Sequence, residues 1–114
     1  MKMVVYTINL KDDPKLIEEY KTYHKNIWDE VKAGLKEAGI RKNWIYLLGT
    51  RLVNIMEVDD NYDPENSIKD YYKSRPKVEE WAKLMATYQE PVPEARPDEW
   101  WAQMEKIFEF ISED

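Results

Sequence analysis

The chain has 114 residues, a length that suits one domain with a modest hydrophobic core, and we expect residues 1–114 to form that single domain. Its formal charge of −6 argues against a nucleic-acid partner, and the absence of cysteine excludes disulfides, thiolate metal sites and a cysteine nucleophile. The first residues lack the apolar stretch of a signal peptide and no run approaches membrane-spanning length, so we expect a cytoplasmic protein with no membrane partner.

The first part of the chain predicts a strand followed by a helix. An apolar, β-branched run over 3–10 indicates the strand, and Asp13 and Pro14 suit an N-cap and a first helical position. Apolar residues then recur at helical spacing as far as Gly39, which ends the helix in the usual C-terminal manner. A continuous helix here would be long, and a break near Lys25-Asn26 is the alternative.

Two strand-like runs and a second helical region occupy the middle of the chain. The runs cover 43–48 and 52–58 and flank Gly49-Thr50-Arg51, an arrangement typical of a hairpin. A polar loop then leads to a helical region that extends to about Gln89 and breaks before Pro76.

The predicted elements have the order strand, helix, strand, strand, helix, and a final strand would complete a ferredoxin-like βαββαβ pattern. Residues 104–111 are the place for that strand, although their periodicity is ambiguous between helix and strand. We therefore predict an α+β fold with an antiparallel sheet and both helices on one face. The other face would be uncovered, which favours a homodimer, and the Trp100-Trp101 pair is interpreted as packing or a dimer cover.

The single histidine of the chain, His24, lies on the apolar stripe of the predicted first helix. At about 100° per residue, that stripe comprises Ile17, Tyr20, His24, Trp28, Val31 and Leu35. With a reference pKa of roughly 6.5, histidine suits general acid–base catalysis near neutral pH. The alternative is a core histidine satisfied by one hydrogen bond, or a histidine at a dimer contact.

Several segments, taken in chain order, form a set that extends over nearly the whole sequence. They are Tyr20-x-x-x-His24-x-x-x-Trp28, Gly39, Asn43-Trp44-Ile45-Tyr46-Leu47, Glu57-Val58, Trp81-Ala82-Lys83-Leu84-Met85 and Lys106-Ile107-Phe108-Glu109-Phe110. This ordered set resembles the L-rhamnose mutarotase family. The resemblance implies a dimeric α/β barrel that interconverts the α and β anomers of a deoxyhexose.

The resemblance also implies roles for individual residues. In the family, the histidine at the position of His24 is the proton donor. The tyrosine at the position of Tyr20 and a tryptophan pair beginning at Trp81 contact the sugar.

Two substrate-contacting positions depart from the family pattern. The family's second tryptophan is Ala82 here, and its strand tyrosine aligns with Asn43. Trp44 would replace that tyrosine ring only if the strand slipped by one residue, because neighbouring side chains face opposite sides of a sheet. These changes bear on which sugar is bound more than on the reaction.

Mutarotation fits the residue types of this chain without a metal or a redox cofactor. One proton is given to the ring oxygen and one is taken from the anomeric hydroxyl, which one histidine and a second polar group can do by general acid–base catalysis. Trp81 offers an apolar platform for the sugar, and Tyr20 and Asn43 offer hydrogen bonds to its hydroxyls. Candidates for the second proton-transfer group are Glu57 and Tyr46, although Glu57 also fits an ordinary surface charge.

The sequence thus leaves three functions to distinguish. The leading hypothesis is an isomerase acting on a free 6-deoxy sugar such as L-rhamnose or L-fucose. The alternatives are a cofactor-free monooxygenase of the dimeric ferredoxin-like class and a non-catalytic barrel that binds a small molecule.

Overall fold

Three long antiparallel strands form the sheet of the protein, whose computed structural model describes residues 1–113. They are β1 (Lys2–Leu10), β2 (Ile40–Leu48) and β3 (Arg51–Val58), and β3 lies between the other two. Two short strands, β4 (Gln89–Glu90) and β5 (Ala102–Gln103), pair with the other edge of β1. The strand order is β2-β3-β1-β4, and every pairing is antiparallel, as the element order predicted.

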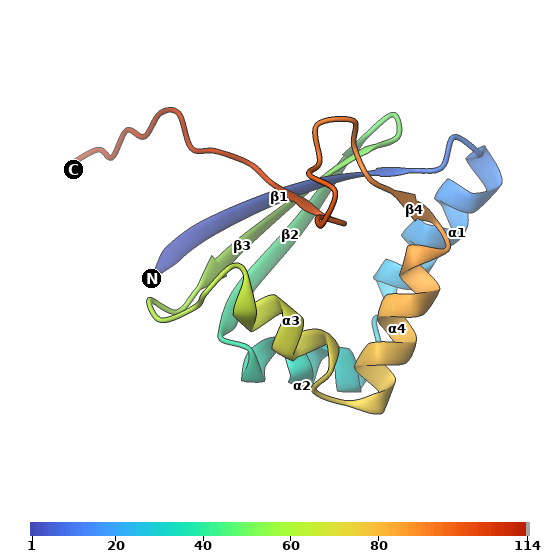
Figure 1. The fold of residues 1–114 in the computed structure, drawn as a ribbon, viewed down its shortest axis with the longest axis horizontal. Coiled ribbons are helices and arrows are strands. Elements are labelled where there is room, and N and C mark those ends of the chain that lie inside the picture. The colour runs from blue at the N-terminus through green and yellow to red at the C-terminus, as the bar shows by residue number, and fades with distance from the viewer. Residues whose placement is uncertain (114) are drawn as a thin grey trace.

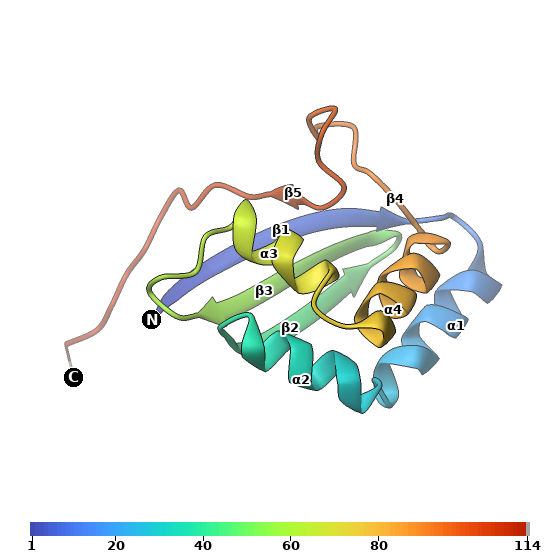
Figure 2. The same ribbon diagram turned by 60° about the horizontal axis from the view of Figure 1, so that its bottom comes forward.

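Four helices of the described residues cover one face of this sheet (Figures 1 and 2). They are α1 (Pro14–Lys25), α2 (Asp29–Glu37), α3 (Asn66–Tyr72) and α4 (Pro76–Ala86). The prediction of helices on a single face is confirmed, and each of the two predicted helical regions is divided in two. Asn26 is the C-cap residue of α1, which places the first division at the predicted break, and Pro76 begins α4 at the second.

Local signals in the sequence set the ends of these elements. Asp13 caps α1, because its Oδ1 accepts a hydrogen bond of 2.9 Å from the backbone N–H of Lys15. Gly39 follows α2 with a φ of 89°, in the left-handed region that favours glycine, and so turns the chain into β2. Gly49, with a φ of 61°, turns β2 into β3 and confirms the predicted hairpin.

The final strand predicted over residues 104–111 is wrong. The structure shows neither helix nor strand for residues 104–113, and this segment extends away from the body of the protein (Figure 1). A strand requires continued pairing along a neighbouring edge, and the last such bond here runs from the N–H of Met104 to the carbonyl of Val5 in β1. Beyond Met104 the chain leaves that edge and has no strand partner. The last strand pairings of the fold therefore come from residues 89–103, and the apolar side chains of 104–113 lie in solvent.

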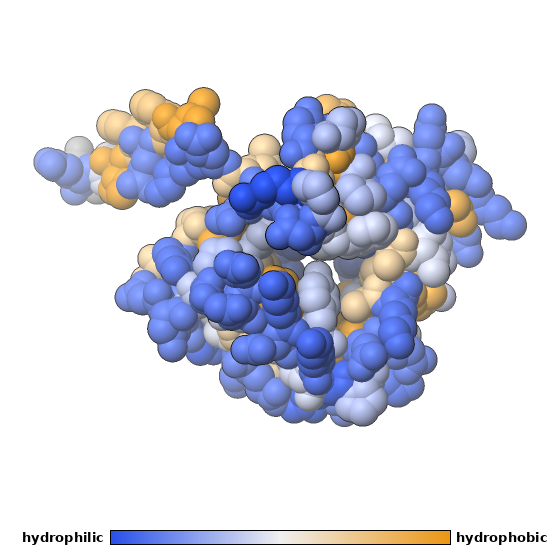
Figure 3. Space-filling model, in the orientation of Figure 1, coloured by the Kyte–Doolittle hydropathy of each residue, from blue (hydrophilic) through white to orange (hydrophobic). Residues whose placement is uncertain are grey.

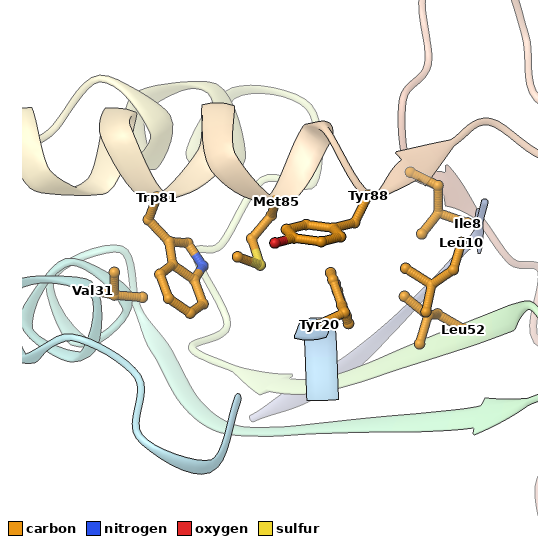
Figure 4. Packing of buried hydrophobic residues seen from close by; sticks show 8 residues of the cluster. All are labelled: Ile8, Leu10, Tyr20, Val31, Leu52, Trp81, Met85 and Tyr88. Carbon is orange, nitrogen blue, oxygen red and sulfur yellow. The ribbon is translucent and has the colours of Figure 1, made fainter. Parts of the chain in front are cut away.

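Side chains of the sheet alternate between two very different environments. On the helix-facing side, Ile8 and Leu10 of β1 pack with Leu52 of β3 against residues of α1 and α4, as Figure 4 shows. The opposite side of the sheet has no covering layer in the described residues (Figure 2). Trp44 and Tyr46 point to that side and lie exposed. The core is thus confined to one side of the sheet, between strands and helices.

Candidate functional site

A cavity of about 360 Å³ lies between the helix-facing side of β2 and β3 and the helices. The four residues that the sequence predicted for the site all line it: Tyr20, His24, Asn43 and Trp81. They come from α1, β2 and α4, so the fold brings together residues that are up to about sixty positions apart. Figure 3 shows a hollow near the centre of the molecule, between the helices and the segment that follows α4.

His24 lies half-buried on the cavity side of α1, between two aromatic rings. Its ring centroid is 4.4 Å from that of Tyr20 and 5.4 Å from that of Trp81. Its Nδ1 lies 2.8 Å from the carbonyl oxygen of Tyr20. A carbonyl only accepts hydrogen bonds, so Nδ1 carries the hydrogen and the neutral imidazole keeps a free lone pair on Nε2.

Burial determines the charge state of this imidazole. Loss of hydration lowers the pKa of His24 below its ordinary value of 6.5, and the hydrogen bond to the carbonyl of Tyr20 opposes that shift. At neutral pH the side chain is therefore an uncharged base. It is a group suited to taking a proton from a hydroxyl inside a largely apolar cavity.

Tyr20 is almost completely buried and is tied to residues near the end of the chain. Its hydroxyl accepts a hydrogen bond of 2.9 Å from Nε2 of Gln89, and Oε1 of Gln89 accepts one of 2.8 Å from the indole N–H of Trp100. Desolvation raises the pKa of Tyr20 to about 12, and the hydrogen bond from Gln89 opposes the shift. The phenol is therefore protonated at neutral pH.

Trp81 belongs to both the core and the cavity wall. It is 8% exposed, and its ring meets those of Trp28 and Tyr23 edge-on at centroid distances of 5.1 and 6.1 Å. This packing fixes the indole, and the part that remains exposed faces the cavity with His24. An aromatic surface held in this way suits the C–H face of a sugar ring.

The structure answers the question of Asn43 and Trp44. Asn43 pairs with Met56 of β3 and lines the cavity, and its Nδ2 donates to the side-chain oxygen of Asn54 and, at 3.2 Å, to the carbonyl of Ile55. Trp44 lies on the opposite, open side of the sheet. Of the two neighbouring residues, Asn43 therefore faces the cavity and Trp44 does not.

Both candidates for a second proton-transfer group are wrong for this cavity. Glu57 and Tyr46 pair with Met3 and Val53, on the side of the sheet that faces away from the helices. The alternation of side chains along a strand thus separates them from His24 by the sheet itself. Neither residue lines the cavity, and Tyr46 is 63% exposed.

Several residues of the cavity wall were not among the site residues predicted from the sequence. Gln89, Asn54, Trp100 and Trp101 all line the cavity. The tryptophan pair had a visible signal, and the packing role expected for it is found for Trp101, which lies against both core clusters. Gln89 and Asn54 gave no signal, because a single amide residue does not indicate which cavity it will reach.

The same two tryptophans also line a second hollow, which is larger and more polar. That hollow has a volume of about 560 Å³ and shares Asn54, Trp100 and Trp101 with the first cavity. Charged side chains such as Asp63 and Arg96 lie along its wall. An apolar chamber that contains the histidine thus adjoins a polar chamber.

Two negative findings hold for the described residues 1–113. No helix among them is long and apolar enough to cross a membrane. No group of three or more His, Cys, Asp or Glu side chains is placed to hold a metal ion.

Comparison with known protein families identifies one match over most of the chain. The family model for L-rhamnose mutarotase matches residues 3–110. An L-fucose mutarotase of Xanthomonas campestris pv. campestris is 35% identical over 111 residues, which cover 95% of this chain and 87% of that protein. A UPF0734 protein of Dictyostelium discoideum is 39% identical over 111 residues, 95% of this chain and 89% of that protein.

Solved structures share the fold at much lower sequence identity. An L-rhamnose mutarotase from Formosa agariphila superposes with a TM-score of 0.70 at 19% identity, covering 97% of this chain and all of that one. A dimeric ferredoxin-like protein from an uncultured marine organism gives a TM-score of 0.57 at 13% identity, covering 96% and 98% of the two chains. These likenesses confirm the ferredoxin-like α+β fold.

Proposed function

The chain belongs to the L-rhamnose mutarotase family, and we propose that it interconverts the α and β anomers of a free 6-deoxyhexose with His24 as a proton-transfer group. Membership of this family makes the chain an isomerase-type enzyme. The observation that carries the proposal is the position of His24. It is a neutral imidazole with a free Nε2, and it lines a cavity beside Tyr20 and Trp81.

The size and lining of the cavity favour a single small ring. Ligand cavities range over roughly 300–1,000 Å³, and about 360 Å³ lies at the lower end of that range. Apolar walls from Ile45, Met56 and Met85 suit the C–H face and the methyl group of a deoxy sugar. The amides of Asn43 and Asn54 offer partners for its hydroxyls.

The reaction proceeds by opening and closing the hemiacetal. Nε2 of His24 takes the proton of the anomeric hydroxyl, a carbonyl forms at C1, and the C1–O5 bond breaks with its electron pair moving to O5. A second group gives a proton to O5. Rotation about the C1–C2 bond presents the other face of the carbonyl, and the same steps in reverse close the ring as the other anomer. No net proton, electron or cofactor is consumed, and each acid–base group contributes about 10²–10⁴-fold.

L-Rhamnose and L-fucose are the first substrates to test, because proteins of these two activities are similar to this chain. Ala82 lines the cavity where the resemblance implies a second tryptophan, so the pocket has more room on that wall. This extra room favours a tolerant pocket over strict recognition of one sugar.

The enzyme works as a homodimer, with a second copy covering the open side of the sheet. That side exposes large apolar side chains, among them Trp44, Tyr46 and Leu48. The segment 104–113 adds Ile107 and Phe108, and it extends too far from its own sheet to cover that side (Figures 1 and 3). Apolar surface of this extent is typical of protein interfaces, and a second copy offers the same surface in return.

The test is the rate at which the protein exchanges sugar anomers. Saturation-transfer NMR on L-rhamnose, L-fucose and a hexose that retains its 6-hydroxyl measures that rate with and without protein. We expect exchange of both deoxy sugars to be faster with protein than in buffer alone. If none of the sugars exchanges faster, the proposed function is wrong.

A further inference from the structure

Three side chains form a hydrogen-bonded series that ends at the cavity. The indole N–H of Trp100 donates to Oε1 of Gln89 at 2.8 Å, and Nε2 of Gln89 donates to the hydroxyl of Tyr20 at 2.9 Å. Gln89 is only 5% exposed, although it is polar. Its backbone is held in β4, where it pairs with Leu10 of β1.

The chemistry of the three groups fixes the direction of every bond in this series. An indole N–H can only donate, so the atom of Gln89 that faces Trp100 must be the amide oxygen. The amide nitrogen then faces Tyr20 and donates, so the oxygen of Tyr20 accepts. The hydroxyl proton of Tyr20 is consequently left free for another partner. Tyr20 and Gln89 both line the cavity, so the hydroxyl that joins them lies at the cavity wall.

We propose that Tyr20 is the second proton-transfer group, which donates to the ring oxygen of the sugar, and that Gln89 and Trp100 are positioning residues that keep its hydroxyl proton directed into the cavity. This inference rests on the proposed function. His24 and Tyr20 then present opposite polarities in one cavity: a free lone pair on Nε2 and a free proton on Oη. Ring opening needs one acceptor and one donor of this kind.

The proton transfers balance over the reaction. As the C1–O5 bond breaks, O5 takes the electron pair and receives the hydroxyl proton of Tyr20, while Nε2 of His24 takes the proton of the anomeric hydroxyl. On closure, O5 returns its proton to the tyrosinate and attacks C1, and O1 receives the proton from His24. Because an alkoxide is a stronger base than a tyrosinate, the transfer to O5 is favourable even for a phenol whose pKa is raised to about 12.

Replacing Gln89 by glutamate reverses one bond and keeps the other. A carboxylate accepts from the indole of Trp100 as before, but it also accepts from Tyr20, whose proton is then turned away from the sugar. We expect Gln89→Glu to lower kcat by about 10²-fold, the magnitude typical of losing one preorganised donor to a developing oxyanion. The matched control is Gln89→Met, which removes both bonds and leaves Tyr20 free to rotate with its proton available.

The order of the two variants separates a positioning role from a structural one. If Gln89 only supports the fold, Gln89→Glu keeps two hydrogen bonds and should be the more active variant. If Gln89 sets the direction of the proton, Gln89→Met should be the more active one. The comparison uses the plateau of each pH profile, because the added charge alone would only shift that profile by raising the pKa of His24.

Trp100→Phe gives a second test at a partly exposed position, where a loss of folding is not expected. Without the indole donor, the side-chain amide of Gln89 can rotate and exchange its oxygen and nitrogen. We expect kcat to fall less than in Gln89→Glu, with little change in KM. The inference is overturned if Gln89→Glu matches or exceeds Gln89→Met in kcat, or if Trp100→Phe has the parent's kcat. A parent enzyme that exchanges no sugar would instead overturn the proposed function, so the two failures are distinguishable.

Discussion

Replacing Trp81 by alanine tests whether this ring belongs to the sugar site or only to the core. The indole is almost completely buried and lies within 6.1 Å, between ring centroids, of Trp28, His24 and Tyr23. Truncating a buried tryptophan costs about 3–5 kcal/mol, and aromatic pairs of this geometry contribute about 0.5–1.5 kcal/mol each. For a domain of this size, such a loss lowers the melting temperature by roughly 10–20 °C.

The functional consequence must be measured on folded protein, and Trp81→Phe supplies the matched control. Phenylalanine keeps a ring against Trp28 and restores most of the packing, but it offers the sugar a smaller platform. We expect KM to rise slightly in Trp81→Phe and strongly in Trp81→Ala, because the apolar contact stabilises the bound sugar. The pH dependence of kcat should stay the same in Trp81→Phe, which keeps a ring beside His24, whereas Trp81→Ala hydrates the imidazole and moves its pKa back toward the ordinary value.

Anomer exchange measured over a range of sugar concentrations, with circular dichroism at the same temperature, gives both quantities. A folded Trp81→Ala variant with the parent's KM would refute the reasoning, and Trp81 would then be a core residue only. A changed pH profile in Trp81→Phe would equally contradict it, since the ring would then act on the titration of His24 and not on sugar affinity.

Two further predictions concern pH and assembly. Burial lowers the pKa of His24, and the neutral imidazole is the active base. The rate of anomer exchange above the buffer background should therefore be constant at neutral pH and fall as the pH drops through that lowered pKa. A rate that rises on acidification would contradict this. Truncation after Glu105 removes Ile107, Phe108, Phe110 and Ile111, each worth about 1.5–3 kcal/mol if buried by a second copy. The truncated chain should therefore fold but sediment as a weaker dimer, and an unchanged dissociation constant would exclude this segment from the interface.

Local patterns were sufficient to predict most of the elements. The N-cap at Asp13, the glycines at 39 and 49 and the proline at 76 act over a few residues, so their effects can be read along the chain. The strand expected over 104–111 failed for the opposite reason. Its composition suits a strand, but pairing depends on where the chain runs, and after Met104 the segment leaves the edge of β1.

The site residues show the same distinction between local and long-range information. His24, Tyr20 and Trp81 lie on apolar helix stripes, and the helical period alone was enough to predict that they face inward. The choice between Asn43 and Trp44 depended on an irregularity in the pairing between Ile40 and Lys42, since a shift of one residue exchanges the two faces of a strand.

The place of Gln89 at the cavity could not be predicted from the sequence, for a related reason. It reaches Tyr20 across 69 positions of sequence, through the pairing of β4 with β1. No periodicity in the chain encodes a contact of that range. The pairing of the strands alone brings the amide to the cavity.

The most direct test of the account is anomer exchange by His24→Asn. Asparagine keeps a polar side chain of similar reach at this position, but it cannot take up and return a proton near neutral pH. We predict a folded, dimeric protein that still binds the deoxy sugar and exchanges its anomers about two or more orders of magnitude more slowly than the parent. A folded His24→Asn protein that retains most of the parent's exchange rate would contradict the central claim, because the proton would then move without the histidine.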